Sequence, residues 1–418
     1  MTETILQIGE GRFLRGFFDW MVQELSTKTS DEGNVVVVLP RPARPGVRDL
    51  WEQQDAQFSV HIRGTMKGTR VDQAHRIAVV SRLLDAHSQW PDFLATASNP
   101  HITTIVTNTT EAGLVYQDEP YDEWRSPHSV GGKLTRWLWQ RYQIFSGSPE
   151  AGVDVLPCEL IEENAVALTA LIHRHAEAWQ LPAGFQMWLD HSRFFNTLVD
   201  SIVADAPLPA GPLDVVREPY YRWTIQTTGG IVPRLPFREA GLHVDYVSDL
   251  APQQALKVRV LNGAHTAMAG LGVMLGIRTV GEAMNHSRMR RFVERLLVDE
   301  VAPTLPPLGI ALEAAHTFIA DVLERFQNPD ITHLLEHIQL NALSKVKTRL
   351  LPTLHDAWAQ TASVPPLLTL AVAAQSVLAG SPAATLAPQL PESLSEQVAG
   401  YMDALKEKGP TQVLDNVL

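Results

Sequence analysis

Residues 4–20, TILQIGEGRFLRGFFDW, decide the fold of the first half of the chain. Ile5 to Ile8 form a short apolar run of the kind found in buried parallel strands, and Gly9 and Gly11 follow it directly. Apolar residues then recur at helical spacing: Phe13, Leu14, Phe17, Phe18 and Met21. The order strand, glycine turn and helix is typical of a Rossmann-type domain, in which the start of the helix binds a pyrophosphate.

The glycine turn departs from the usual dinucleotide fingerprint at its third small residue. Position 14 holds Leu, and the next small residue is Gly16. The turn therefore has two interpretations. It is either a plain tight turn or a cofactor site whose candidate residues are Gly9, Gly11, Arg12 and Phe13.

The second predicted strand, Asn34 to Leu39, ends in Pro40-Arg41-Pro42. A NAD-selecting fold normally places Asp or Glu at this strand end, where the carboxylate binds the ribose 2′-hydroxyl. No acid stands there. Arg41 either faces the 2′-phosphate of NADP or is a solvated loop residue. These residues therefore do not decide whether the cofactor is NAD or NADP.

Strand and helix patterns alternate as far as about residue 205. A strand at residues 102–106 leads into a polar cluster, which we expect to lie at the cofactor ribose unless it only forms local turns: Asn108, Thr109, Thr110 and Glu111. Further elements are predicted as a helix at 132–145, a strand at 153–156 and a helix from 159 to about 180. The pattern predicts an α/β domain with a parallel sheet.

The pattern of predicted secondary structure changes after the Pro-rich segment 207–212. Two extended stretches, 220–226 and 243–247, precede a nearly all-helical remainder, in which residues 365–391 are expected to form a helix and a surface linker. The boundary belongs between residues 205 and 250. We divide the chain into a dinucleotide-binding domain at 1–212 and a mostly α-helical domain at 213–418.

Composition favours a cytoplasmic enzyme with a small-molecule substrate. The chain has 418 residues, of which 45% are hydrophobic, so it can bury a large core. Its net charge of −12 and its lack of basic tracts argue against nucleic acid or an anionic membrane as partner. No apolar run is long enough to span a bilayer. The single cysteine, Cys158, excludes an intrachain disulfide and a thiolate metal cluster.

A second informative stretch is residues 254–266, QALKVRVLNGAHT, which reads as a helix. At about 100° per residue, Asn262 lies roughly 140° and His265 roughly 80° around the axis from Lys257. These three side chains can therefore meet at one reacting oxygen. The alternative is a solvated lysine and an Asn-Gly pair that marks a helix end.

One spacing in the second half suggests a metal. Residues 333–337, HLLEH, match the HxxEH pattern of some zinc peptidases. The pattern is short enough to arise by chance, and we predict no metal.

Several blocks together resemble the mannitol (polyol-specific long-chain) dehydrogenase family. They are IGEGRFLRGF, TNTTEAG, LPCELIEENA, FFNTLVDSIV and LKVRVLNGAHTAM, in the family's order and spacing. GKLTRWLWQRY, VGEAMN and KVKTRLLPTL are most similar to the branch that interconverts tagaturonate and altronate. The resemblance implies hydride transfer between NAD(P) and a keto carbon, C3 in this branch, without a metal.

The resemblance also implies roles for individual residues. Lys257 matches the family's general base, and burial would favour the neutral amine that a base needs. Asn262 and Asn196 match its donors to the developing alkoxide. His265 matches the residue that binds a neighbouring hydroxyl.

Five positions bear on substrate choice or depart from the family pattern. Ser201 replaces an Arg of the family signature, which affects the packing of the domains more than the chemistry. His337 replaces an Arg of the polyol-oxidising relatives, whereas Lys345 keeps the family's Lys. A hexuronate carboxylate needs a basic partner. Lys345, Lys347 and Arg349 are candidates that cannot all face one way, and we choose Lys345 and Arg349.

We therefore predict an NAD(P)-dependent sugar-acid oxidoreductase, acting as a monomer or small homo-oligomer. Fructuronate or mannitol specificity would keep the same Lys, Asn and His residues. A non-catalytic dinucleotide sensor would keep Gly9 and Gly11 but lose the base, and the presence of Lys257 argues against it.

Overall fold

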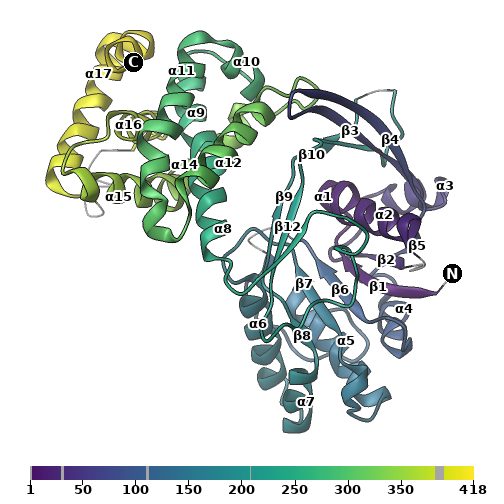
Figure 1. Cartoon of the computed structure of the whole chain (residues 1–418). Coiled ribbons are helices and arrows are strands. Elements are labelled where there is room, and N and C mark those ends of the chain that lie inside the picture. The colour runs from purple at the N-terminus through teal and green to yellow at the C-terminus, as the bar shows by residue number, and fades with distance from the viewer. Residues whose placement is uncertain (1, 30–32, 110–112, 208, 382–389) are drawn as a thin grey trace. The chain divides into compact units, whose positions relative to one another are not determined.

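The computed structural model describes residues 2–29, 33–109, 113–207, 209–381 and 390–418 (Figure 1). The chain forms two compact units: unit 1 is Met1–Arg63 with Asp72–Leu250, and unit 2 is Gly64–Val71 with Ala251–Leu418. The boundary at Leu250 thus lies beyond the division that we placed after residue 212. The physical reason is that the strands in between pair with strands of unit 1.

The main sheet of unit 1 has six strands in the order β5-β2-β1-β6-β7-β8, and all its neighbours are parallel. In this order the strands are Val80–Asp85, Asn34–Leu39, Glu3–Ile8, Thr104–Thr107, Asp154–Pro157 and Arg193–Phe194. From β1 the chain adds β2 and β5 on one side, and it then crosses over to add β6, β7 and β8 on the other side. The order of the strands therefore reverses between β1 and β6, although the strands themselves stay parallel. Rossmann-type sheets bind dinucleotides at this switch point, so the predicted α/β class is confirmed.

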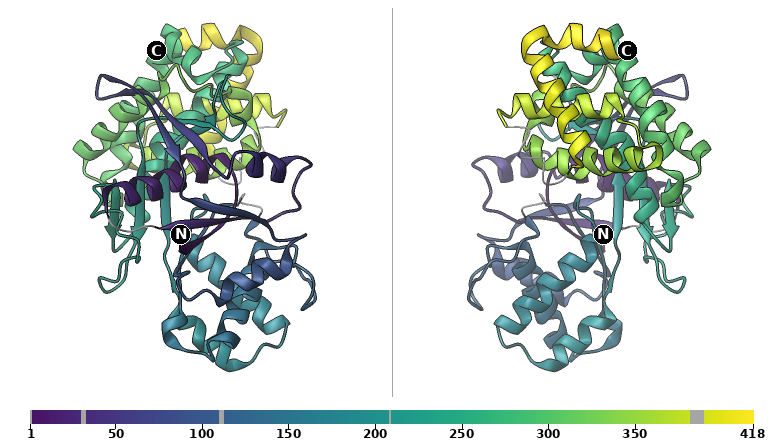
Figure 2. Two further views of the ribbon diagram at one scale, coloured as in Figure 1. Left: turned by 90° about the vertical axis from the view of Figure 1, so that its right-hand side faces the viewer. Right: turned by 90° about the vertical axis from the view of Figure 1, so that its left-hand side faces the viewer.

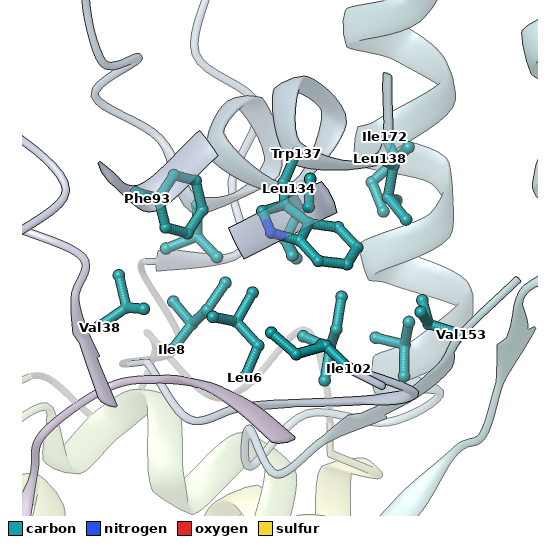
Figure 3. Packing of buried hydrophobic residues seen from close by; sticks show 14 of the residues in the cluster. Leu6, Ile8, Val38, Phe93, Ile102, Leu134, Trp137, Leu138, Val153 and Ile172 are labelled. Carbon is teal, nitrogen blue, oxygen red and sulfur yellow. The ribbon is translucent and has the colours of Figure 1, made fainter. Parts of the chain in front are cut away.

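The core of unit 1 follows from the side-chain pattern of the sheet. All six residues of β2 are buried, as expected for a parallel strand covered on both faces. On β1, Leu6 and Ile8 point into the hydrophobic cluster beneath Trp137 (Figure 3). Trp137 fits there because its indole N–H donates to Thr96 at 2.8 Å. Gln7 points to the opposite face, since successive strand residues alternate.

Unit 1 also contains helices. They are α1 (Arg12–Leu14), η1 (Arg15–Asp19), α2 (Trp20–Lys28), α3 (Val47–Gln53), α4 (Trp90–Ala95), η2 (Thr96–Ser98), α5 (Val130–Ile144), η4 (Pro149–Ala151), α6 (Asn164–Ala178), α7 (Ala183–Trp188) and η5 (Leu189–His191). α6 begins five residues later than predicted. Glu163, which precedes it, has a left-handed backbone with φ 48°, so the helix cannot extend back through it.

Unit 1 contributes to two smaller sheets, of which the sequence analysis predicted two strands, the extended stretches 220–226 and 243–247. One has the order β10-β11-β3-β4, and the other β13-β12-β9. Their strands are β3 (Phe58–Met66), β4 (Thr69–Ile77), β9 (Thr197–Asp200), β10 (Val203–Asp205), β11 (Val215–Arg217), β12 (Arg222–Gln226) and β13 (Val244–Val247). Lys67 and Gly68 join β3 to β4 with φ values of 52° and 74°, as a tight hairpin turn requires.

Unit 2 is helical, as predicted. Its helices are α8 (Ala251–Leu256), η6 (Lys257–Asn262), α9 (Gly263–Met274), α10 (Val280–Asn285), α11 (Ser287–Arg295), η7 (Leu296–Val301), η8 (Ala302–Thr304), η9 (Pro306–Leu308), α12 (Leu312–Phe326), α13 (Leu335–Gln339), α14 (Ala342–Lys345), η10 (Val346–Leu350), α15 (Leu351–Thr361), α16 (Pro366–Leu378) and α17 (Glu392–Val417). α16 is buried on nearly all sides and lies beside α9 and α17 (Figure 2). Most of the predicted linker falls at 382–389, outside the described residues.

Within the described ranges, none of the helices combines the length and the apolar character needed to cross a membrane.

Candidate active site

The glycine turn after β1 lies at the switch point of the main sheet. The N–H of Gly9 donates to the carbonyl of Val38 at 2.9 Å, which ties the turn to β2. Gly9 has φ 129°, and a Cβ on it would stand 2.9 Å from the carbonyl oxygen of Asn108. Only glycine fits there. Around Gly11 a Cβ would meet nothing within 4 Å.

A continuous helical run from Arg12 to Lys28 follows the turn, with a π-helical segment at Arg15–Asp19. Arg12 pairs with Asp205 at 2.7 Å, and Phe13 stacks on Phe17 at 4.9 Å between ring centroids. The helix approaches the second sheet closely. A Cβ on Gly16 would stand 2.6 Å from a methyl carbon of Val203. Gly16 is therefore the small residue that permits close helix–strand packing.

The ends of β6 and β7 are joined by a carboxylate that the sequence analysis did not single out. Glu159 accepts hydrogen bonds from the hydroxyl of Thr107 and from the backbone N–H of Thr109, both at 2.9 Å. The side-chain amide of Asn108 donates to the carbonyl of Cys158 at 2.7 Å. Burial raises the pKa of Glu159. Thr110 and Glu111, also predicted at the cofactor, lie outside the described residues.

An acid does stand beside the end of β2, but on the neighbouring strand. Asp85, the last residue of β5, is in register with Leu39, the last residue of β2. Burial opposes its ionisation, yet N–H groups of His87 and Ser88 more than compensate and lower the pKa of Asp85. Arg41 is exposed. A long-range strand pairing, which local sequence does not encode, brings this carboxylate to the strand end.

Asn196 lies between β8 and β9. Its side-chain oxygen accepts N–H groups from the first turn of α6, at Ala165 (2.9 Å) and Val166 (3.3 Å). Its amide nitrogen donates to the side-chain oxygen of Gln226 at 3.0 Å. An Asn amide carries two N–H groups, and among the described residues only one of them has a hydrogen-bond partner.

In unit 2, Lys257 and Asn262 are the first and last residues of the π-helical segment η6. The N–H of Gly263 donates to the carbonyl of Val258, five residues back, which is the π-helical pattern. A turn of this width brings residues five apart closer to one face than an α-helix does. The π turn thus moves Asn262 towards the face of Lys257, whose side chain is buried.

His265 follows on α9 in an enclosed position. Only 7% of it is exposed, and its Nε2 has no hydrogen-bond partner among the described residues. Its ring lies 4.3 Å from that of Phe326 and 4.8 Å from that of His333, between centroids. Burial, followed by the nearby His333, lowers the pKa of His265 well below its usual value. The imidazole is therefore neutral and can serve as donor and acceptor.

The charges of three basic side chains reach this imidazole. The charges of Arg325, Arg349 and Lys345 all act on His265. Lys345 and Arg349 are half-buried, whereas Lys347 between them is exposed. The structure thus brings together two of the three candidates from the sequence. Arg325 and His333 were not predicted as site residues, because no local pattern marks them.

The HxxEH pattern does not form a metal site in this arrangement. His333 precedes α13 and faces His265, while His337 lies on the helix and is exposed. Across the described part of the chain, no three His, Cys, Asp or Glu side chains are grouped so as to hold a metal ion.

Comparison with known proteins matches both units. The profile of the mannitol dehydrogenase Rossmann domain matches residues 3–237, and that of the mannitol dehydrogenase C-terminal domain matches residues 249–414. The chain belongs to the mannitol dehydrogenase family. The predicted family is confirmed, and membership makes the protein an NAD-dependent oxidoreductase that acts on CH–OH groups.

Relatives in the mannitol dehydrogenase family cover most of the chain. An altronate oxidoreductase of Halalkalibacterium halodurans is 39% identical over 90% of this chain and 74% of its own length. One of Bacillus subtilis is also 39% identical, over 89% of this chain and 78% of its own. Mannitol 2-dehydrogenase of Pseudomonas fluorescens shares the fold, with a TM-score of 0.80 at 21% identity, covering 100% of this chain and 94% of that one.

Proposed function

We propose that the protein interconverts D-tagaturonate and D-altronate, with NADH as the reductant. The observation that carries the proposal is the positive charge near His265, where the charges of three basic residues act on the imidazole: Arg325, Lys345 and Arg349. A hexuronate ends in a carboxylate, which guanidinium groups bind strongly, whereas a polyol has no charge. The name of the relatives at 39% identity, altronate oxidoreductase, supports the same substrate class.

The residues divide the chemistry among them. Bound NADH supplies the hydride. In reduction, the ammonium of Lys257 gives its proton to the substrate oxygen as that oxygen gains charge, and in oxidation the amine takes the proton back. Asn262 and Asn196 donate N–H groups to the developing alkoxide. Because His265 is neutral, its unprotonated ring nitrogen can accept a hydrogen bond from a neighbouring substrate hydroxyl.

The cofactor contacts in this proposal come from the glycine turn and the strand ends beside it. The open backbone at Gly11 would bind the pyrophosphate, with Arg12 and Phe13 at the start of the helix. Asn108 and Thr109 would lie near the ribose. We expect a cytoplasmic enzyme that works as a monomer or small homo-oligomer.

The direct test is NADH oxidation with tagaturonate, fructuronate and fructose in parallel. We expect tagaturonate to have the highest kcat/KM and fructose, which lacks the carboxylate, to react poorly. If fructuronate is reduced faster than tagaturonate, the preferred substrate is the other epimer. Equal rates with fructose would refute a carboxylate site.

A matched pair of variants locates the carboxylate site. Arg349→Gln should raise KM for tagaturonate about 10- to 100-fold, which corresponds to the loss of a hydrogen bond to a charged group. Lys347→Gln, two residues away on an exposed side chain, should leave KM unchanged. The same effect in both variants would indicate general electrostatics instead of a contact.

A further inference from the structure

The neighbours of Asn196 accept only one orientation of its side-chain amide. Its oxygen receives the N–H groups of Ala165 and Val166, which belong to the first turn of α6. Helix N–H groups at this position have no acceptor within the helix. The reversed amide would turn its own N–H groups against these two donors. The oxygen of Asn196 must therefore face the helix.

Gln226, at the end of β12, holds the other side of the amide. Its side-chain oxygen accepts an N–H from Asn196 at 3.0 Å, and its own Nε2 donates to the carbonyl of Ser248 at 3.1 Å. The backbone N–H of Gln226 also donates to the carbonyl of Asn196 at 2.8 Å. Reversing the Gln226 amide would break both side-chain bonds. Its orientation is fixed in turn.

This relay runs from Ser248 through Gln226 to Asn196 and on to the start of α6. Each amide in it donates at one end and accepts at the other. One N–H of Asn196 is used by Gln226, and the direction of the second follows, because the amide group is planar. The second N–H is the only one that can serve a ligand.

We propose that Gln226 is a positioning residue, which aims the remaining N–H of Asn196 at the reacting oxygen of the substrate. The inference rests on the proposed function, in which Asn196 is a donor to the alkoxide. Oxyanion donors are effective because they are oriented before the charge develops. Without Gln226, Asn196 keeps its bond to the helix but loses the partner that sets its tilt.

The test compares Gln226→Met with wild type. We expect kcat for tagaturonate reduction to fall about 10-fold, a part of the roughly 100-fold loss expected when an oxyanion donor is removed. KM and the Kd for NADH, measured by fluorescence titration, should stay unchanged, and so should the Tm. Gln23→Met is the matched control, since Gln23 is also half-buried and accepts a backbone N–H, that of Ala78 at 2.8 Å. If Gln226→Met does not fold, Gln226→Ala is measured in its place.

A double-variant cycle separates the possible outcomes. Gln226→Met should have no further effect on kcat in an Asn196→Ala background, because Gln226 acts through Asn196. If Asn196→Ala lowers kcat and Gln226→Met does not, the positioning role is refuted while the proposed function stands. Independent, additive losses would also overturn it. If Asn196→Ala leaves kcat unchanged, both the donor role and the positioning role fail. The proposed activity is still tested separately, by NADH oxidation with tagaturonate, fructuronate and fructose.

Discussion

Replacing Asp19 by Asn should stabilise the protein at neutral and alkaline pH. Asp19 is fully buried on the helix that follows the glycine turn. Its Oδ2 accepts a weak hydrogen bond from Gln7 at 3.5 Å, and its Oδ1 has no partner among the described residues. Burial raises the pKa of Asp19 from 3.8 to about 7. An ionised carboxylate here is thus poorly compensated.

The magnitude follows from the two pKa values. Below a pH of 3.8, Asp19 is protonated in both the folded and the unfolded chain and costs nothing. As the pH rises, the unfolded chain loses this proton first, so the free energy of unfolding falls until the folded form also ionises near pH 7. At about 1.4 kcal/mol per pH unit, the loss above this pH is about 4 kcal/mol. Asn carries no charge, so the Asp19→Asn variant avoids this loss of stability.

Urea denaturation followed by tryptophan fluorescence measures this difference, since Trp20 is adjacent to Asp19. The advantage of Asp19→Asn over wild type should grow from near zero at about pH 4 to its full value above about pH 7, where Asp19 is ionised in both states. Asp190→Asn, an exposed aspartate of the same unit, is the control and should show no such trend. An advantage of Asp19→Asn that does not change with pH would refute the reasoning.

Three further changes probe the candidate site. Lys257→Met should lower kcat by about 100- to 10,000-fold with the Kd for NADH unchanged, and a near-native rate at neutral pH would remove Lys257 from the role of base. Asn262→Ala should lower kcat by about 100-fold with a smaller change in KM, whereas an effect on KM alone would indicate a purely structural amide. Arg41→Ala should weaken NADPH binding by about 1.5–3 kcal/mol and spare NADH, and equal effects in titrations of both cofactors would show a loop residue.

The sequence by itself determined the elements whose signal is local. The apolar runs of β1 and β2 and the helical periodicity of α5 are continuous segments, so their burial pattern can be read directly. The glycines of the turn and the spacing of Lys257, Asn262 and His265 are also local. Together with the order of the blocks that resemble the family, they sufficed for the fold class and the family.

Only the tertiary structure decided what depends on contacts between distant segments. Asp85 stands beside Leu39 because two strands pair, and Gln226 meets Asn196 because β12 pairs with β9. Arg325 and His333 reach His265 through helix packing. The π turn that draws Asn262 towards Lys257 likewise departs from the α-helical spacing assumed from sequence. Such contacts produce no periodic pattern in the sequence, because each one depends on the path that the chain takes between the two residues.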